Sequence, residues 1–260
     1  MSKPTNIGNY AKHAFMWDLY GPDRNDDFEY WRTYAHQYGK NVLIPMCAVG
    51  KNGTYMAERG LNVTAFDITP EMITEGQKRY GHINNLKLLH GDIRNFNFDI
   101  PPADFCYCVD LGHLQTINDI KNAFKCINKH LRKGGGFVVE TGLRSGNDKL
   151  EYFPLREFDF GEVAPGIKLR KVNNGKCHND GQNGRQYISQ DVYIEDTKTG
   201  SVEMFDHSFY LQSYFRDEWV NAFHECGFEI KHEYKNRESE AWQKGDGLWI
   251  VEVVKKTDIL

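Results

Sequence analysis

Long apolar runs and an excess of basic residues are both missing from this chain. No stretch approaches the roughly 20 apolar residues that cross a bilayer as a helix. The first residues, MSKPTNIGNYAKHAF, lack the apolar region of a secretory signal. A net charge of -4 gives no basic footprint for DNA or RNA. We therefore expect a cytoplasmic protein that binds neither membranes nor nucleic acids.

Cysteine spacing typical of a metal site is missing too. The six cysteines should be reduced thiols in the cytoplasm. Cys106 and Cys108 stand two apart in an apolar run, so they should share one buried face of a strand. Cys177 and His178 are adjacent, but no second pair of ligands accompanies them. We expect no metal site.

Alternation of strand and helix patterns dominates the first half of the chain. With 260 residues and 40% hydrophobic content, the chain can bury one substantial core, and we expect a single domain over 1–260. The expected strands are 42–46, 62–66, 86–90, 104–108 and 137–140, and the expected helices are 50–59, one beginning at 69, and 118–131. Such alternation predicts a doubly wound, Rossmann-like α/β fold with its ligand at the carboxyl ends of the strands.

The pattern changes after Thr141. Segments 167–172, 186–195 and 202–211 predict a small antiparallel sheet, with Gly200 closing a hairpin. A helix over 216–226 and strands over 228–234 and 247–254 should complete a seven-stranded mixed sheet. The expected parts are an N-terminal helical cap (1–40), a cofactor-binding half (41–145), an antiparallel insert on the substrate side (155–212), and the last helix and strands (213–260).

A nucleotide-type strand-helix-strand unit spans 42–67, VLIPMCAVGKNGTYMAERGLNVTAFD. In such units a helix N-terminus meets the ligand, and an acid at the end of the second strand accepts hydrogen bonds from ribose hydroxyls. Asp67 stands at that position. The turn is unusual, because Met46 and Ala48 replace the glycines expected beside the ligand and only Gly50 remains.

Polar residues also follow the next two strands. Asp92 could accept from an adenine amine while Ile93 packs against the ring, and Asp110 would lie where a substrate enters. His113, three residues further on, could take a proton from a substrate amine or hydroxyl. The alternatives are ordinary turn or capping aspartates and an imidazole that only shapes its loop.

An ordered series of motifs then connects the chain to a known family. The matching segments are Val42-Leu43, Ala57-Glu58-Arg59-Gly60, Asp67-Ile68-Thr69-Pro70-Glu71-Met72, Gly91-Asp92, Leu131-Arg132-Lys133-Gly134-Gly135 and Cys226-Gly227-Phe228. The chain resembles the class I S-adenosylmethionine (SAM)-dependent methyltransferases, particularly the branch with glycine N-methyltransferase and the amino-sugar N-methyltransferases. It departs from their pattern at the first turn and at Ile44, where the family has an acid.

The resemblance implies SAM as cofactor and S-adenosylhomocysteine as product. It implies that Trp17 and Tyr20 pack over the methionine half of the cofactor and that Arg24 pairs with its carboxylate. The remaining cofactor contacts implied are Met46, Ala48, Gly50, Ile68, Met72 and Val109.

The resulting expectation is an N-methyltransferase of a small polar amine or amino acid, with His113 as the catalytic residue. The antiparallel insert should choose the substrate, with Tyr187, Tyr193, His207 and Tyr210 as candidate contacts. Oxygen methylation, another use of the sulfonium, a non-catalytic cofactor-binding protein and self-association into a homo-oligomer all stay open. A nicotinamide-dependent oxidoreductase is disfavoured, because MCAVGKNG lacks the G-x-G-x-x-G pattern.

Overall fold

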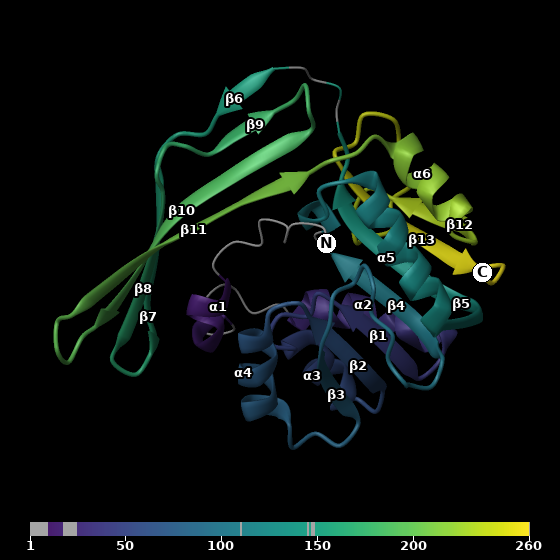
Figure 1. Ribbon diagram of the computed structural model, residues 1–260, viewed down its shortest axis with the longest axis horizontal. Helices are drawn as coiled ribbons and strands as arrows, with labels where there is room; N and C mark the ends of the chain where they lie inside the picture. Colours follow the sequence, from purple (N-terminus) through teal and green to yellow (C-terminus); the bar gives the residue numbers. More distant parts are fainter. Residues whose placement is uncertain (1–9, 18–24, 110, 145, 147–148, 260) are drawn as a thin grey trace.

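A central mixed sheet organises the molecule. The computed structural model describes residues 10–17, 25–109, 111–144, 146 and 149–259. Seven strands form the central sheet in the order β12-β13-β5-β4-β1-β2-β3 (Figure 1). Their bounds are β1 (Asn41–Pro45), β2 (Asn62–Asp67), β3 (Leu86–His90), β4 (Ala103–Val109), β5 (Leu131–Gly142), β12 (Phe228–Tyr234) and β13 (Leu248–Lys255). Strands β1 to β5 are parallel, and β13 is antiparallel to both of its neighbours. The predicted seven-stranded mixed sheet is confirmed.

Helices cover both faces of this sheet. Helices α5 (Ile117–His130) and α6 (Arg216–Glu225) share a core with Leu43 and Cys106. On the other face, α2 (Asn25–Tyr38), α3 (Lys51–Ala57) and part of α4 (Pro70–Tyr80) pack with Val42 and Phe105. Successive strand residues thus point into opposite cores, which explains why these strands are apolar throughout rather than alternating.

Local chemistry sets where the helices begin. Thr69 precedes α4 and Pro70 takes its first position, as predicted. Thr116 caps α5, since its hydroxyl accepts from the backbone N–H of Asp119 at 3.1 Å. A Cβ on Gly76 would lie 2.4 Å from the carbonyl oxygen of Val49. Glycine therefore lets α4 lie directly against the turn that follows β1.

The N-terminal part contains α1 (Tyr10–His13), the short 3-10 helix η1 (Ala14–Met16) and α2. A second 3-10 helix, η2 (Leu111–His113), lies between β4 and α5. Figure 1 shows α1 between α4 and the second sheet, beyond the carboxyl ends of the central strands. These short elements enclose the edge of the sheet at which a ligand is expected.

The second sheet is larger than the sequence predicted. It contains β6 (Leu150–Tyr152), β7 (Arg156–Ala164), β8 (Ile167–Asn173), β9 (His178–Asp180), β10 (Arg185–Asp196) and β11 (Val202–Gln212). Strands β8, β10 and β11 correspond to the three predicted strands, whereas β6, β7 and β9 were missed. The insert therefore begins at Leu150 rather than at 155. The predicted bounds of β5 were also too narrow, because Leu131 already pairs with Ala103; the register is irregular over 132–135, and regular pairing with β4 starts at Gly136.

Candidate active site

A pocket opens at the carboxyl ends of β1, β2, β3 and β4. This is the point where the strand order reverses between β1 and β4, the usual ligand site of a doubly wound sheet. The pocket is lined by Tyr10, Trp17, Met46, Ala48, Phe66, Asp67, Ile68, Thr69, Met72, Gly91, Asp92, Ile93, Arg94, Val109, His113 and Leu114. Most of the wall is apolar, with a few polar groups converging on it, as in small-molecule sites generally.

The structure brings together most of the residues that the sequence singled out. The predicted residues that line the pocket are Trp17, Met46, Ala48, Asp67, Ile68, Met72, Asp92, Ile93, Val109 and His113. Gly50 is not among them. Tyr20, Arg24 and Asp110 lie outside the described residues. Six lining residues were not predicted from the sequence, and all but the first directly adjoin a predicted residue or motif: Tyr10, Phe66, Thr69, Gly91, Arg94 and Leu114.

The turn after β1 keeps a glycine-like backbone without glycine. Met46 has φ 56° and Ala48 has φ 51°, both in the left-handed region that costs residues with a Cβ about 1–2 kcal/mol. The loss of the glycines therefore does not remove the positive φ values, contrary to what the residue types favour. Gly50 has φ 89° and caps α3, and a Cβ there would lie 2.6 Å from Leu88. Gly50 therefore shapes the turn, and its contact with the cofactor stays a prediction.

Asp67 is held at the end of β2 by the backbone around it. One carboxylate oxygen accepts from the N–H of Ala48 and the other from the N–H of Thr69, each at 2.9 Å. Burial raises the pKa of Asp67, while these backbone hydrogen bonds oppose the rise. Because a carboxylate offers about four acceptor positions, Asp67 can also accept from the donors of a ligand.

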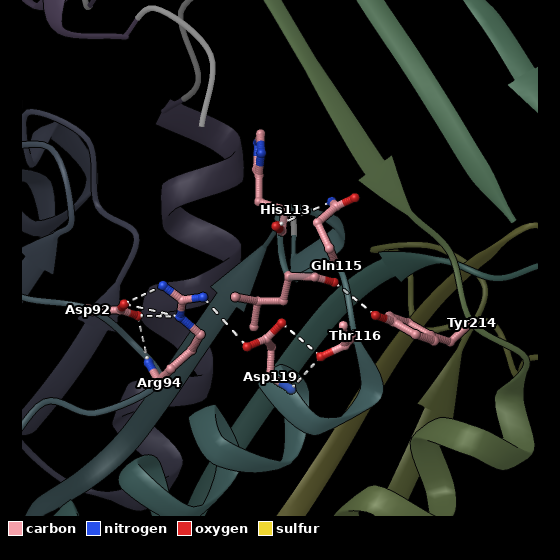
Figure 2. A network of polar contacts seen from close by, with 8 residues as sticks. Asp92, Arg94, His113, Gln115, Thr116, Asp119 and Tyr214 are labelled. Atoms are coloured by element: carbon pink, nitrogen blue, oxygen red, sulfur yellow. Dashed lines mark hydrogen bonds and ion pairs between the residues drawn. The ribbon is translucent and has the colours of Figure 1, made fainter. Parts of the chain in front are cut away.

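Asp92 is the start of an ionic chain that crosses to α5 (Figure 2). The Arg94 guanidinium donates to both of its oxygens, at 2.6–3.0 Å, and also lies 3.5 Å from a carboxylate oxygen of Asp119. Burial alone would raise the pKa of Asp92, but the hydrogen bonds from Arg94 lower it overall. Arg94 therefore keeps this pocket carboxylate ionised and fixed in orientation.

His113 lies where the pocket meets the insert. Its Nε2 is 3.3 Å from the hydroxyl of Tyr10, and its ring is 5.1 Å from that of Phe209 on β11. Tyr10 also packs edge-on against His207, with ring centroids 4.6 Å apart. Burial, with the charge of Lys171 nearby, lowers the pKa of His207 to about 4. An aromatic wall thus joins α1, the His113 loop and β11.

Strand register separates the four candidate contacts of the insert. His207 lies on the face toward α1, as its contact with Tyr10 shows. Tyr210 is three residues further along β11 and so points to the opposite face. Tyr187 pairs with Tyr210 and Tyr193 pairs with Met204, which places both on that outer face as well. Of the four, His207 alone faces the pocket side.

Comparison with known proteins assigns the first half of the chain. Residues 42–135 match the family described as a methyltransferase domain. This segment is similar to methyltransferase domains. It contains β1 to β4 and the polar residues at their ends, so the family match and the pocket involve the same part of the chain.

Relatives and solved structures extend the likeness. The demethylmenaquinone methyltransferase of Staphylococcus haemolyticus (strain JCSC1435) is 33% identical over 96 residues, which are 36% of each chain. The chain spans between about a third and about half of the length of the curated relatives it matches.

Two solved structures share the fold over most of the chain. A SAM-dependent methyltransferase from Clostridium acetobutylicum ATCC 824 superposes with a TM-score of 0.70 at 16% identity, covering 89% of this chain and 93% of the other. The sugar N-methyltransferase KedS8 from Streptoalloteichus sp ATCC 53650 gives 0.72 at 16% identity, covering 91% and 90%. The predicted resemblance to SAM-dependent methyltransferases is confirmed, with the methyltransferase domain and the insert both inside the shared fold.

Two features of the described residues concern membranes and metal ions. None of the described helices is long and apolar enough to cross a membrane. Among the same residues, no group of three or more His, Cys, Asp or Glu side chains is arranged to hold a metal ion.

Proposed function

We propose that this chain is a SAM-dependent methyltransferase that methylates the nitrogen of a small polar amine or amino acid. The observation that carries the proposal is the pocket itself. It combines a carboxylate prepared for hydroxyl donors, Asp67, with an imidazole at the opening toward the insert, His113. A residue expected to bind the cofactor and a residue expected to act on the methyl acceptor thus line the same pocket.

The residues present fit SAM. Asp67 retains acceptor positions for the two hydroxyls of a ribose, and Phe66, Ile68 and Ile93 offer apolar surface for an adenine ring. Trp17 packs with Ala48 and Met72 on the other side of the pocket, and its ring can lie close to a sulfonium. Pairing of Arg24 with the methionine carboxylate stays a prediction.

Methyl transfer needs little from the protein beyond orientation and proton removal. Bound SAM would supply a methyl group that is already activated by a positively charged sulfur. The neutral amine nitrogen of the acceptor forms the new bond to carbon as the carbon–sulfur bond breaks, and the nitrogen then loses a proton. We assign acceptance of that proton to His113, whose contact with Tyr10 orients the imidazole.

Two features favour nitrogen and a small acceptor. The fold extends over most of a sugar N-methyltransferase, insert included. The inner face of the insert beside His113 carries aromatic rings, His207 and Phe209, together with Lys171, which suits a compact polar molecule with an apolar face. Oxygen methylation uses the same geometry, and a protein that binds SAM without turnover is the remaining alternative. Self-association stays a prediction that light scattering tests.

The first experiment separates cofactor binding from catalysis. Titration calorimetry should give micromolar binding of SAM and S-adenosylhomocysteine and none of NADH. Asp67→Ala should weaken SAM binding at least tenfold, since a buried acceptor to two hydroxyls is worth about 1.5–3 kcal/mol. His113→Ala should lower turnover on amine acceptors far more than it changes SAM affinity.

The matched control is Glu71→Ala, an exposed acid on α4 outside the pocket. It should bind SAM as the wild type does. No binding of either sulfur ligand would reject the proposal as an activity. SAM binding with no methylation of amines, acids or sugars would favour the non-catalytic alternative.

A further inference from the structure

The loop between β4 and α5 carries His113 and is fastened to the insert by one amide. The Nε2 of Gln115 donates to the backbone carbonyl oxygens of Gly112 at 3.1 Å, His113 at 3.3 Å and Tyr210 at 2.9 Å. The first two lie in its own loop and the third lies in β11. Figure 2 shows Gln115 beside His113, with Tyr214 and Asp119 around the same loop. Gln115 thus connects the backbone of His113 to the insert.

Close packing of the loop on β11 accompanies this connection. The Tyr214 hydroxyl donates to the carbonyl oxygen of Leu114 at 2.9 Å in a buried setting. A Cβ on Gly112 would lie 3.3 Å from the carbonyl oxygen of Gln212 and 3.4 Å from the Cβ of Leu211. The loop backbone therefore lies against the strand itself, with little room for either to shift alone.

The opposite end of the loop is joined to the cofactor side of the pocket. Thr116 and Asp119 begin α5, and Asp119 is paired with Arg94, which holds Asp92 (Figure 2). The loop is therefore fixed on one side by an ionic chain toward the pocket, and on the other by Gln115 to β11 and by Tyr214 to the segment that follows β11. His113 lies between the two attachments, and its ring contacts Tyr10 and Phe209.

We propose that Gln115 is a positioning residue, which sets the His113 imidazole relative to the pocket by holding its loop on β11. This inference rests on the proposed function, in which His113 takes the acceptor's proton. Proton transfer and methyl transfer depend on placement, and an error of about 1 Å can cost about 100-fold in rate. Because Gln115 connects the loop to β11, the position of the insert determines where His113 lies.

The residue type suits this role. A primary amide supplies two N–H donors, and here three carbonyl oxygens share them. Leucine of similar size offers no donor, and glutamate would place a carboxylate against three carbonyl oxygens. Both changes should free the loop from β11 without touching the pocket wall, because Gln115 does not line it.

Gln212 provides a matched control on the same strand as Tyr210. Its Nε2 also donates to three carbonyl oxygens, those of Asn183 at 2.7 Å, Gly184 at 3.3 Å and Ser213 at 3.0 Å. These carbonyls belong to the insert and the segment after it, not to the His113 loop. Gln212→Leu should therefore cost a similar set of hydrogen bonds while leaving His113 attached.

The experiment compares Gln115→Leu, Gln212→Leu and the wild type by two measurements. In spectra of the full chain with ¹⁵N-labelled histidine, Gln115→Leu should shift the His113 ring signals, assigned with His113→Ala, and Gln212→Leu should not. With an amine that the wild type methylates as substrate, Gln115→Leu should lower kcat at least about tenfold, while the Kd for SAM changes less than about twofold. Gln115→Glu should repeat both effects.

Failure of this inference and failure of the proposed function give different results. Unchanged His113 signals in Gln115→Leu would overturn the inference whatever the activity. A kcat loss in Gln212→Leu equal to that in Gln115→Leu would also overturn it, because the effect would then be a general loosening of the insert. If the wild type methylates nothing, the proposed function fails, and the ring signals alone decide whether Gln115 places His113.

Discussion

The part of the molecule built on the central sheet and the insert differ in how they are held together. Around the central sheet, helices cover both faces, and two large clusters of buried side chains fill the space between. The buried cluster of the insert is small: Leu169, Val192 and Phe205 pack with Met16 of η1 and a few half-buried neighbours. The difference indicates a rigid part that fixes the cofactor and a thinly packed part that can vary to suit an acceptor.

The largest expected effect measures this difference directly. Phe124 is fully buried and stacks on Phe223 with centroids 4.4 Å apart. Phe124→Ala should lower the free energy of unfolding by about 3–5 kcal/mol, because its neighbours cannot close the cavity. Phe205→Ala in the insert should lower the free energy of unfolding by about 1.5–3 kcal/mol, which is close to the free energy of burying the side chain without an added cost for a cavity. Urea denaturation of both variants gives the two values.

Tryptophan fluorescence and circular dichroism should be followed together. None of the five tryptophans lies within 150–212, so fluorescence reports on the rest of the chain while dichroism reports on both sheets. Equal losses of unfolding free energy in the two variants would contradict the proposed difference in packing between the central sheet and the insert. Separate unfolding transitions by fluorescence and dichroism would support it, since the insert would then unfold on its own.

A buried histidine offers the next test, with acid as the perturbation. His207 faces α1 from the insert, and burial lowers its pKa to about 4 from the ordinary 6.5. Between these values the unfolded chain binds the extra proton and the folded chain does not. Stability should therefore fall as the pH drops from 6.5 to 4, by up to about 3 kcal/mol from this group.

His207→Gln should remove that part of the acid sensitivity, while the exposed His82→Gln should leave it in place. Thermal unfolding between pH 4 and pH 7.5 measures the difference between each variant and the wild type. An identical pH dependence in His207→Gln would mean that the insert admits water at this position, and that its inner face is not closed.

The strands of the central sheet could be predicted from the sequence more fully than those of the insert. The bounds of β3 and β12 were predicted to the residue, and a glycine marks one end of each, since Gly91 follows β3 and Gly227 precedes β12. Strands β6 and β9 were missed because they are only three residues long, and β7 because none of its residues is fully buried and its register is interrupted around Gly161. The expected strand began at Phe137, but β5 begins at Leu131 and pairs regularly with β4 from Gly136, where a Cβ would overlap the ring of Tyr38.

In the candidate site, too, some residues could be predicted from the local sequence and others could not. Asp67 could be located because the acid that ends a mostly buried parallel strand must lie at the edge of the sheet. Tyr10 and Gln115 could not, because their contacts join segments about 100 residues apart through the way the insert folds back. Arg94 stands two residues from Asp92, but nothing in the local pattern distinguishes it from a solvated arginine.

The smallest expected effect concerns the turn after β1. At Ala48, with φ 51°, glycine relieves the positive φ but gains freedom in the unfolded chain. Ala48→Gly should therefore change the free energy of unfolding by less than about 1 kcal/mol. Ala48→Val should destabilise more, because a β-branched residue at positive φ is a genuine outlier. Chemical denaturation of both variants tests this.

Cofactor affinity in the same two variants decides what the altered turn means. The N–H of Ala48 holds one oxygen of Asp67, so any change of backbone here reaches the carboxylate expected to bind the ribose. If Ala48→Gly binds SAM as tightly as the wild type and Ala48→Val binds it more weakly, the backbone conformation matters and the missing glycines do not. Tighter binding by Ala48→Gly would instead show that the side chain narrows the pocket, and that this chain holds its cofactor less firmly than a glycine turn would allow.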